Sequence, residues 1–202
     1  MNDVEPTAKP RAIEKTRVLI GEGVEEVHFL SALLEHLEVS GVQVEHCGGK
    51  DGLGLYLRTL KTRPGFARVE KVGVVRDADE DGTRAAASVA SFIAQATLPP
   101  EVAVSYHIVP ADSSRGALEN LCLASIAGQA LETCIEDFLE CASGATGVVH
   151  GTTTDKAKAR VHAWLAVQSP PDLRLGIAAS KGLVDWESPV FGELKDFLRS
   201  FA

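Results

Sequence analysis

The sequence has a shortage of positive charge. Its 20 Lys and Arg stand against 28 Asp and Glu, which gives a formal net charge of −8. A protein that holds nucleic acid mainly by displacing counterions from the phosphates needs an excess of positive charge. The balance therefore argues against nucleic-acid binding by a basic surface of this chain alone. For phosphate chemistry, a metal ion or a partner protein would have to supply positive charge.

Long apolar runs are also lacking. No stretch approaches the ~18 consecutive apolar residues of a membrane-spanning helix, so we expect no membrane partner. Residues 1–6 show neither the basic nor the apolar segment of a secretory signal peptide, and we expect a cytoplasmic protein. The four cysteines form no C-x-x-C pair and have no His at zinc-finger spacing. They are expected to be buried reduced thiols, with Cys134 and Cys141 on one face of a helix.

The composition is that of an ordinary globular protein, with 45% hydrophobic and 24% charged residues and a mean hydropathy of +0.05. Residues 1–15 are polar, contain two prolines and show no periodicity, which indicates a flexible N-terminal tail. We expect residues 16–202 to form one domain.

Strand-like and helix-like patterns alternate through the first half of the chain. Such alternation is typical of an α/β fold with a mostly parallel central sheet and helices on both faces. After residue 116 the pattern becomes helical, apart from a loop predicted at 144–154, and it closes with an amphipathic helix around 191–201. The predicted strands are 17–21, 42–46, 69–76 and 102–109, and the predicted helices between them are 24–39, 53–61 and 83–96.

Carboxylates follow three of the four predicted strands. The carboxyl ends of parallel strands share one edge of a sheet, where ligands usually bind. Carboxylates held close together repel one another unless a cation lies among them, and oxygen ligands suit Mg²⁺ or Mn²⁺. The predicted metal ligands are Glu22 after the first strand, Asp77, Asp79 and Asp81 after the third, and Glu119 beyond a loop at 112–116.

Each of these residues has a simpler alternative role. Glu22 and Glu119 lie near predicted helix starts, where a carboxylate stabilises the helix dipole, and Asp81 is placed to cap a helix.

The run 77–82 matches the opening of an EF-hand loop, but its twelfth position is Ser88 instead of Glu and a strand precedes it. A haloacid-dehalogenase-type phosphatase is only a minor alternative. In such phosphatases the Asp-x-Asp motif follows the first strand of the domain, whereas Asp77-Ala78-Asp79 follows the third predicted strand. The segment 48–52 lacks the P-loop pattern.

In order and spacing, these motifs resemble those of the TOPRIM domain of topoisomerases, primases and related nucleases. The chain is most similar to small stand-alone TOPRIM-like proteins of unknown function, related to the TOPRIM domain of overcoming-lysogenization-defect (OLD) nucleases. The matching segments are Glu22-Gly23-Val24-Glu25-Glu26, Gly48-Gly49, Asp77-Ala78-Asp79, Gly116-Ala117-Leu118-Glu119 and Ala179-Ser180-Lys181-Gly182.

The resemblance implies Mg²⁺-dependent phosphodiester chemistry on DNA or RNA. Glu22 would act as general acid/base or metal ligand and Asp77 and Asp79 as ligands. Glu119 would serve a second metal, and Lys181 would steady charge on the phosphate. Relatives often have Asp at the position of Glu26. Tyr56 and Tyr106, the only tyrosines, fall within predicted regular elements, so neither is placed as a topoisomerase nucleophile. The alternative is a non-catalytic metal-binding regulatory module that works with a separate ATPase or nucleic-acid-binding partner.

Overall fold

A computed structural model describes residues 11–111, 115–148, 151–169, 171 and 174–202. Four strands form one sheet in the order β2-β1-β3-β4, and every neighbouring pair is parallel. The predicted parallel α/β sheet is confirmed. The strands are β1 (Arg17–Gly21), β2 (Val42–His46), β3 (Lys71–Asp77) and β4 (Ala103–Val109).

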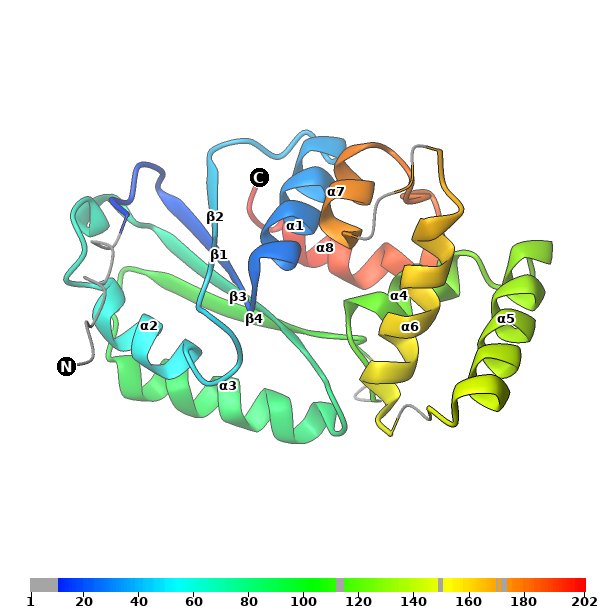
Figure 1. Cartoon of the computed structure of the whole chain (residues 1–202). Coiled ribbons are helices and arrows are strands. Elements are labelled where there is room, and N and C mark those ends of the chain that lie inside the picture. The colour runs from blue at the N-terminus through cyan, green and yellow to red at the C-terminus, as the bar shows by residue number, and fades with distance from the viewer. Residues whose placement is uncertain (1–10, 112–114, 149–150, 170, 172–173) are drawn as a thin grey trace, which may run out of the picture.

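Helices cover both faces of this sheet, as predicted (Figure 1). The helices α2 and α3 lie on one face, while α1, α7 and α8 lie on the other. The helices α4, α5 and α6 extend beyond the end of the sheet and make up most of the predicted helical C-terminal region. The bounds are α1 (Val24–His36), α2 (Leu53–Leu60), α3 (Gly82–Ala96), α4 (Leu118–Ser125), α5 (Ala130–Thr146), α6 (Thr153–Ala166), α7 (Leu175–Ser180) and α8 (Gly192–Arg199), with short 3-10 turns at Phe66–Arg68 and Pro189–Phe191.

Two hydrophobic cores lie on opposite sides of the sheet. Successive strand residues point to opposite faces, so Leu19 belongs to the core that contains Phe29, whereas Val18 and Ile20 belong to the core that contains Leu57. All five of these side chains are fully buried. Burial on both faces explains why β1 is a continuous apolar run and not an alternating one.

A ring from the end of the chain packs against the middle of the sheet. Phe201 is fully buried, and a Cβ atom added to Gly73 on β3 would come within 2.3 Å of its ring. Arg17 on β1 donates a hydrogen bond to the backbone carbonyl of Phe201. The missing side chain at residue 73 therefore makes the space that residue 201 fills.

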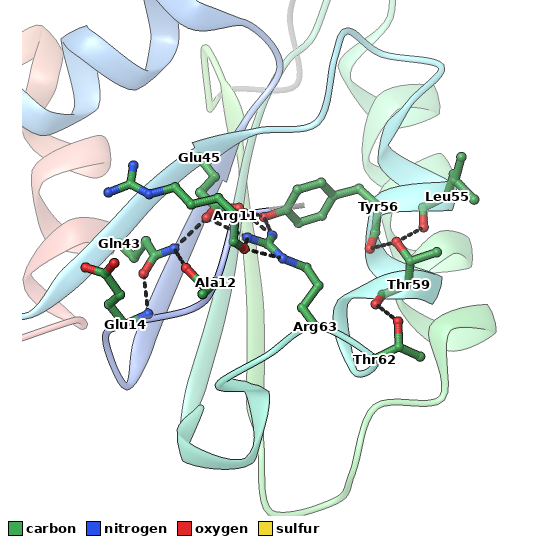
Figure 2. Close-up of polar contacts among 10 residues, drawn as sticks. All are labelled: Arg11, Ala12, Glu14, Gln43, Glu45, Leu55, Tyr56, Thr59, Thr62 and Arg63. Carbon is green, nitrogen blue, oxygen red and sulfur yellow. Dashed lines mark hydrogen bonds and ion pairs between the residues drawn. The ribbon is translucent and has the colours of Figure 1, made fainter. Parts of the chain in front are cut away.

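A buried polar network joins β2 to the segment after α2 (Figure 2). Arg63 donates from Nη1 and Nη2 to the two carboxylate oxygens of Glu45, at 2.5 and 2.8 Å, and Tyr56 donates its hydroxyl to the same carboxylate. The Nε of Arg63 donates to the carbonyl of Arg11 at 3.0 Å. Only 7% of the Arg63 side chain and 11% of that of Glu45 are exposed.

The same network holds part of the segment that we expected to be a tail. Residues 1–10 lie outside the described residues. Beyond them, Gln43 on β2 bonds both the carbonyl of Ala12 and the amide of Glu14, and Ile13 is fully buried. Residues 12–14 are therefore packed against the sheet.

Most boundaries lie within two residues of the predicted ones, and the largest differences are at the end of α1 and in the loop after α5. Helix α1 ends at His36 and does not reach residue 39, because Glu38 adopts a left-handed conformation (φ 56°) that the helix cannot include. The predicted loop at 144–154 is shorter. Helix α5 continues to Thr146, and Thr152 caps α6 by accepting a hydrogen bond from the amide of Asp155 at 3.0 Å.

The cysteine prediction is only partly right. All four thiols are free, and Cys122 is buried, but Cys134 and Cys141 are exposed. Helix α5 buries Ile135 and turns Cys134, Phe138 and Cys141 outward, with Phe138 60% exposed. Seven-residue spacing correctly places the two thiols on one face, but it does not show whether that face is covered. Within the described part of the chain, no helix has the length and apolarity that crossing a membrane requires.

Candidate acidic site

Backbone pairing brings three of the predicted acidic segments together at the carboxyl edge of the sheet. Glu22 directly follows β1, and Asp77 ends the neighbouring strand β3. The Oδ1 of Asp77 accepts a hydrogen bond from the amide of Leu118 at 3.0 Å, which places Glu119 nearby. Asp79 exchanges two backbone hydrogen bonds, of 2.8 and 2.7 Å, with Gly116.

The turn after β3 gives its two further aspartates different positions. Asp79 has φ 53°, in the left-handed region, and this conformation allows the chain to pair with Gly116. Asp81 is the N-cap of α3, and its Oδ1 accepts a hydrogen bond from the amide of Arg84 at 2.9 Å. The capping alternative for Asp81 is therefore observed, and it engages one of the two carboxylate oxygens.

The carboxylates raise one another's pKa values. Burial raises the pKa of Glu22, the charges of Asp79 and Glu26 add to the increase, and Arg76 opposes it. Burial likewise raises the pKa of Asp77 well above its usual range, with contributions from Glu119, Glu22 and Glu26. A raised carboxyl pKa means that the folded protein disfavours negative charge there.

Glu119 belongs to the same group. Burial raises its pKa, Glu26 raises it further, and Lys158 and His162 lower it. These residues also line a small cavity of about 70 Å³, together with Glu25, Leu118, Val161 and Leu175. The site therefore extends from the sheet edge to α6.

Glu26 was not among the predicted ligands, although it affects Glu22, Asp77 and Glu119 alike. Its Oε2 accepts a hydrogen bond from the amide of Gly23 at 2.9 Å, which closes the first turn of α1. The sequence contained a signal for it, because Glu26 lies in the first turn of the helix that begins directly after Glu22 and Gly23.

The sequence analysis also missed a cation within the site. Arg76 lies on β3 with its Nε 3.4 Å from the Oε1 of Glu22, and their side chains are 11% and 18% exposed. The pair is poorly satisfied: Glu22 Oε1 and both Nε and Nη1 of Arg76 are buried and accept or donate no hydrogen bond within the described structure. A charged residue at the end of the apolar run 72–75 was the available signal.

Lys181 is not among the residues that line the small cavity beside Glu119. It is exposed at the C-terminal end of α7, whereas Leu175 at the other end of that helix lines the cavity beside Glu119. At 1.5 Å per residue, the two ends are about 9 Å apart. Helix α7 is attached to α1 by a hydrogen bond of 2.9 Å from the amide of Gly176 to Glu25.

The donor atoms at this edge are of the kind that Mg²⁺ and Mn²⁺ prefer, since all of them are carboxylate oxygens. One of them, Glu22 Oε1, is buried without a hydrogen bond. As the side chains stand, no three His, Cys, Asp or Glu residues in the described ranges are arranged to hold a metal ion. The residue types fit such an ion, and binding would require the carboxylates to move closer together.

Residues 16–202 match the model of the family described as "Protein of unknown function (DUF3226)". The chain belongs to this family. No curated protein matches it.

Among solved structures, the chain is similar to the C-terminal region of the Burkholderia pseudomallei OLD protein. The identity is 14% over 94% of this chain and 100% of that one, with a TM-score of 0.48. It is also similar to the C-terminal region of the Xanthomonas campestris pv. campestris OLD protein, at 13% identity over 92% and 95% of the two chains, with a TM-score of 0.46. These are proteins of the group to which the sequence resemblance pointed.

Proposed function

We propose that this protein catalyses divalent-metal-dependent phosphodiester chemistry on nucleic acid, at an acidic site formed by Glu22, Asp77 and Asp79. The observation that supports the proposal most strongly is the position of Asp77, which ends β3 beside Glu22 and accepts a hydrogen bond from the amide of Leu118, next to Glu119, at 3.0 Å. Burial raises the pKa of this carboxyl, and the charges of Glu119, Glu22 and Glu26 raise it further. Such an arrangement lowers the stability of a metal-free protein, and a bound cation would reverse the effect.

Glu22, Asp77 and Asp79 would hold Mg²⁺ or Mn²⁺, and Glu119 would contribute to a second ion. A bound metal would polarise the phosphate and lower the pKa of a water molecule. Glu22 would bind metal or transfer a proton, for which a raised carboxyl pKa is suited. We assign Asp81 an outer position, through the carboxylate oxygen that does not cap α3. Lys181 would steady a phosphate that extends toward α7.

The proposal includes the setting in which the protein works. We propose that residues 16–202 act as one domain, on DNA or RNA, in the cytoplasm. The four free cysteines are consistent with a reducing compartment.

The test is cleavage of supercoiled plasmid, single-stranded DNA and single-stranded RNA in Mg²⁺ and in Mn²⁺. The Asp77→Asn/Asp79→Asn variant should lose all metal-dependent cleavage. A matched control is Asp137→Asn/Glu140→Gln, which removes two charges from exposed positions on α5. Cleavage that survives in the first variant would show that the site is misplaced, and absence of cleavage by the folded wild type would reject the catalytic proposal.

A second candidate function is a non-catalytic metal-binding module that acts with a protein partner. The exposed face of α5 supports it, because Cys134, Phe138 and Cys141 present an apolar surface to solvent. Metal binding without cleavage, together with a stable complex that Phe138→Glu disrupts, would favour this candidate.

A further inference from the structure

A cleft of about 400 Å³ opens next to the acidic site. Its volume lies within the ~300–1,000 Å³ typical of small-ligand sites. The loop after β2, the end of β3 and the first turns of α3 form its walls. Three basic side chains line it, in a protein whose net charge is −8. The lining residues are Lys50, Asp51, Arg76, Ala78, Asp79, Glu80, Asp81, Arg84, Ala85 and Ser88.

The loop that carries Lys50 is fixed to the end of β1. The amide of Gly49 donates to the carbonyl of Glu22 at 2.8 Å, and that of Cys47 donates to the carbonyl of Gly21 at 3.1 Å. A Cβ atom added to Gly48 or Gly49 would meet nothing within 4 Å, so the space in front of this loop is open. Lys50 is therefore held beside the acidic site, with room for a ligand.

The basic side chains of the cleft can still form ion pairs or donate hydrogen bonds to a ligand. Lys50 and Arg84 are exposed, and neither forms an ion pair with a carboxylate of the described chain. Arg76 is partly buried, and its Nε and Nη1 atoms are buried and donate no hydrogen bond. Unmet donors on a buried guanidinium are costly, and a ligand oxygen would satisfy them.

Two acidic residues of the cleft are engaged elsewhere. Glu80 lies 3.7 Å from Arg115 through Oε2 and accepts a hydrogen bond from the amide of Thr153 at 3.1 Å through Oε1. Asp81 caps α3. Asp79 belongs to the acidic site, where a cation would neutralise it. The Asp81 carboxylate keeps its charge when it caps the helix. With metal bound, the charges left facing the cleft are therefore three bases against Asp51 and Asp81, and this net positive charge would attract an anion.

We propose that this cleft binds a phosphate of a nucleic-acid strand whose neighbouring phosphodiester lies at the acidic site. Arg76 changes partner when a metal ion binds. It neutralises Glu22 in the metal-free protein, and it turns to the phosphate when the cation binds Glu22. Arginine suits this exchange because its planar donors match carboxylate and phosphate oxygens alike. This inference rests on the proposed function and adds a substrate contact to it.

The proposed change of partner predicts that one substitution, Arg76→Gln, strengthens metal binding and weakens oligonucleotide binding. Arg76→Gln removes the internal cation that competes for Glu22, so Mn²⁺ measured by calorimetry without nucleic acid should bind about 5-fold more tightly. The same variant should bind a fluorescent single-stranded 12-residue oligonucleotide in Ca²⁺ about 10-fold more weakly. Arg76→Lys keeps the positive charge, so its Mn²⁺ affinity should stay close to that of the wild type. Unchanged or weaker Mn²⁺ binding by a folded Arg76→Gln variant overturns the exchange.

Lys50→Ala and Arg84→Ala test the cleft without touching buried groups. Each should weaken oligonucleotide binding by about 3- to 10-fold and reduce the slope of log affinity against log salt by about 1. Arg58→Ala, an exposed arginine on α2, is the matched control and should change affinity less than about 2-fold. If the two cleft variants behave like Arg58→Ala, or if the wild type binds no oligonucleotide, the phosphate site is wrong.

These readouts separate the two proposals, because none of them requires turnover. Oligonucleotide binding that depends on Lys50 and Arg84, without cleavage by the wild type, would retain the cleft and reject the catalytic function. Cleavage that requires Asp77 but is indifferent to Lys50, Arg76 and Arg84 would do the reverse.

Discussion

Among the arginine–glutamate pairs of the described residues, one involves strand β2 and another involves its neighbour β1, and these two pairs differ in how completely they are satisfied. Arg63 and Glu45 form two direct hydrogen bonds, and Tyr56 and Gln43 also donate to the Glu45 carboxylate (Figure 2). In the second pair, Arg76 and Glu22, the atoms Nε and Oε1 lie 3.4 Å apart, and three buried atoms lack hydrogen bonds. Burial is similar in both, so burial does not account for the difference.

The difference indicates distinct roles. A buried ion pair lowers the free energy of the folded state only when additional hydrogen bonds satisfy it. The pair beside β2 meets this condition and fastens residues 11–14 to the sheet. The pair between β1 and β3 does not meet it, and its unmet atoms lie among repelling carboxylates. Groups held in this way are typical of sites that bind ligands.

The largest expected effect comes from breaking the satisfied pair. Arg63→Ala leaves a buried Glu45 carboxylate without its main partner, and it should lower the free energy of unfolding by about 3–5 kcal/mol. Urea denaturation at neutral pH measures this change. Arg58→Ala, an exposed change on the adjacent helix, should alter stability by less than about 0.5 kcal/mol. Equal effects of the two substitutions would show that the network contributes nothing.

Removing a charge from the unsatisfied site should act in the opposite direction. Asp77→Asn keeps an oxygen that accepts from the amide of Leu118 and removes repulsion from Glu22, Glu26 and Glu119. The metal-free variant should be about 1–2 kcal/mol more stable than the wild type in urea at pH 7. Mn²⁺ should stabilise the variant less than it stabilises the wild type. A loss of stability in the metal-free variant would mean that the Asp77 charge serves the fold.

Removal of a single hydrogen bond to Glu45 should have a smaller effect and tests the contribution of Tyr56 to the Arg63–Glu45 network. Tyr56→Phe removes one donor to Glu45 and should cost about 0.5–1.5 kcal/mol. Tyr106→Phe, at a tyrosine that is 39% exposed on β4, should be close to neutral. The Tyr56→Phe effect should be no smaller when Arg63→Ala is already present, because Tyr56 and Gln43 are then the donors that remain to the Glu45 carboxylate.

The Arg63–Glu45 pair and the acidic site should also differ in how they affect the dependence of the unfolding free energy on pH. This difference is smallest at neutral pH and largest in acid. Burial would raise the pKa of Glu45, but hydrogen bonds from Arg63, Tyr56 and Gln43 outweigh it and lower the pKa below 4.5. The stability that this residue contributes is therefore present above about pH 4.5 and lost as the pH falls through the lower folded-state pKa. Glu45→Gln should flatten the decline in unfolding free energy between pH 5 and pH 3. An unchanged decline would show that other carboxylates cause it.

The sequence predicted the architecture well because burial of the sheet imposes a strong pattern. The strand β1 is apolar throughout, and the helices that follow the first three strands show apolar faces, so their order was evident. The ends of elements were less predictable. Helix α1 stops at His36 because of the left-handed residue Glu38, and intrinsic preferences at a single non-glycine position do not reveal such a conformation.

The acidic residues were predicted because each follows a strand, and parallel strands end at one edge. Arg76 and Glu26 were missed for a different reason. Whether a charged side chain on a strand or helix forms an ion pair, and how many hydrogen bonds that pair makes, depends on distances in the folded protein. The spacing of residues in the sequence does not give these distances. The exposure of Cys134 and Cys141 was missed for the same reason, since it depends on what packs against α5.

The place of Phe201 has a consequence for synthesis of the protein. Its ring fills the space that Gly73 leaves in β3, and Arg17 on β1 bonds its carbonyl. During translation, the strands leave the ribosome long before this ring does, so one face of the sheet remains incomplete while the later helices are made. The nascent chain should therefore show little resistance to protease until the segment that carries Phe201 can pack on the sheet, and it should then become protected in a single late step.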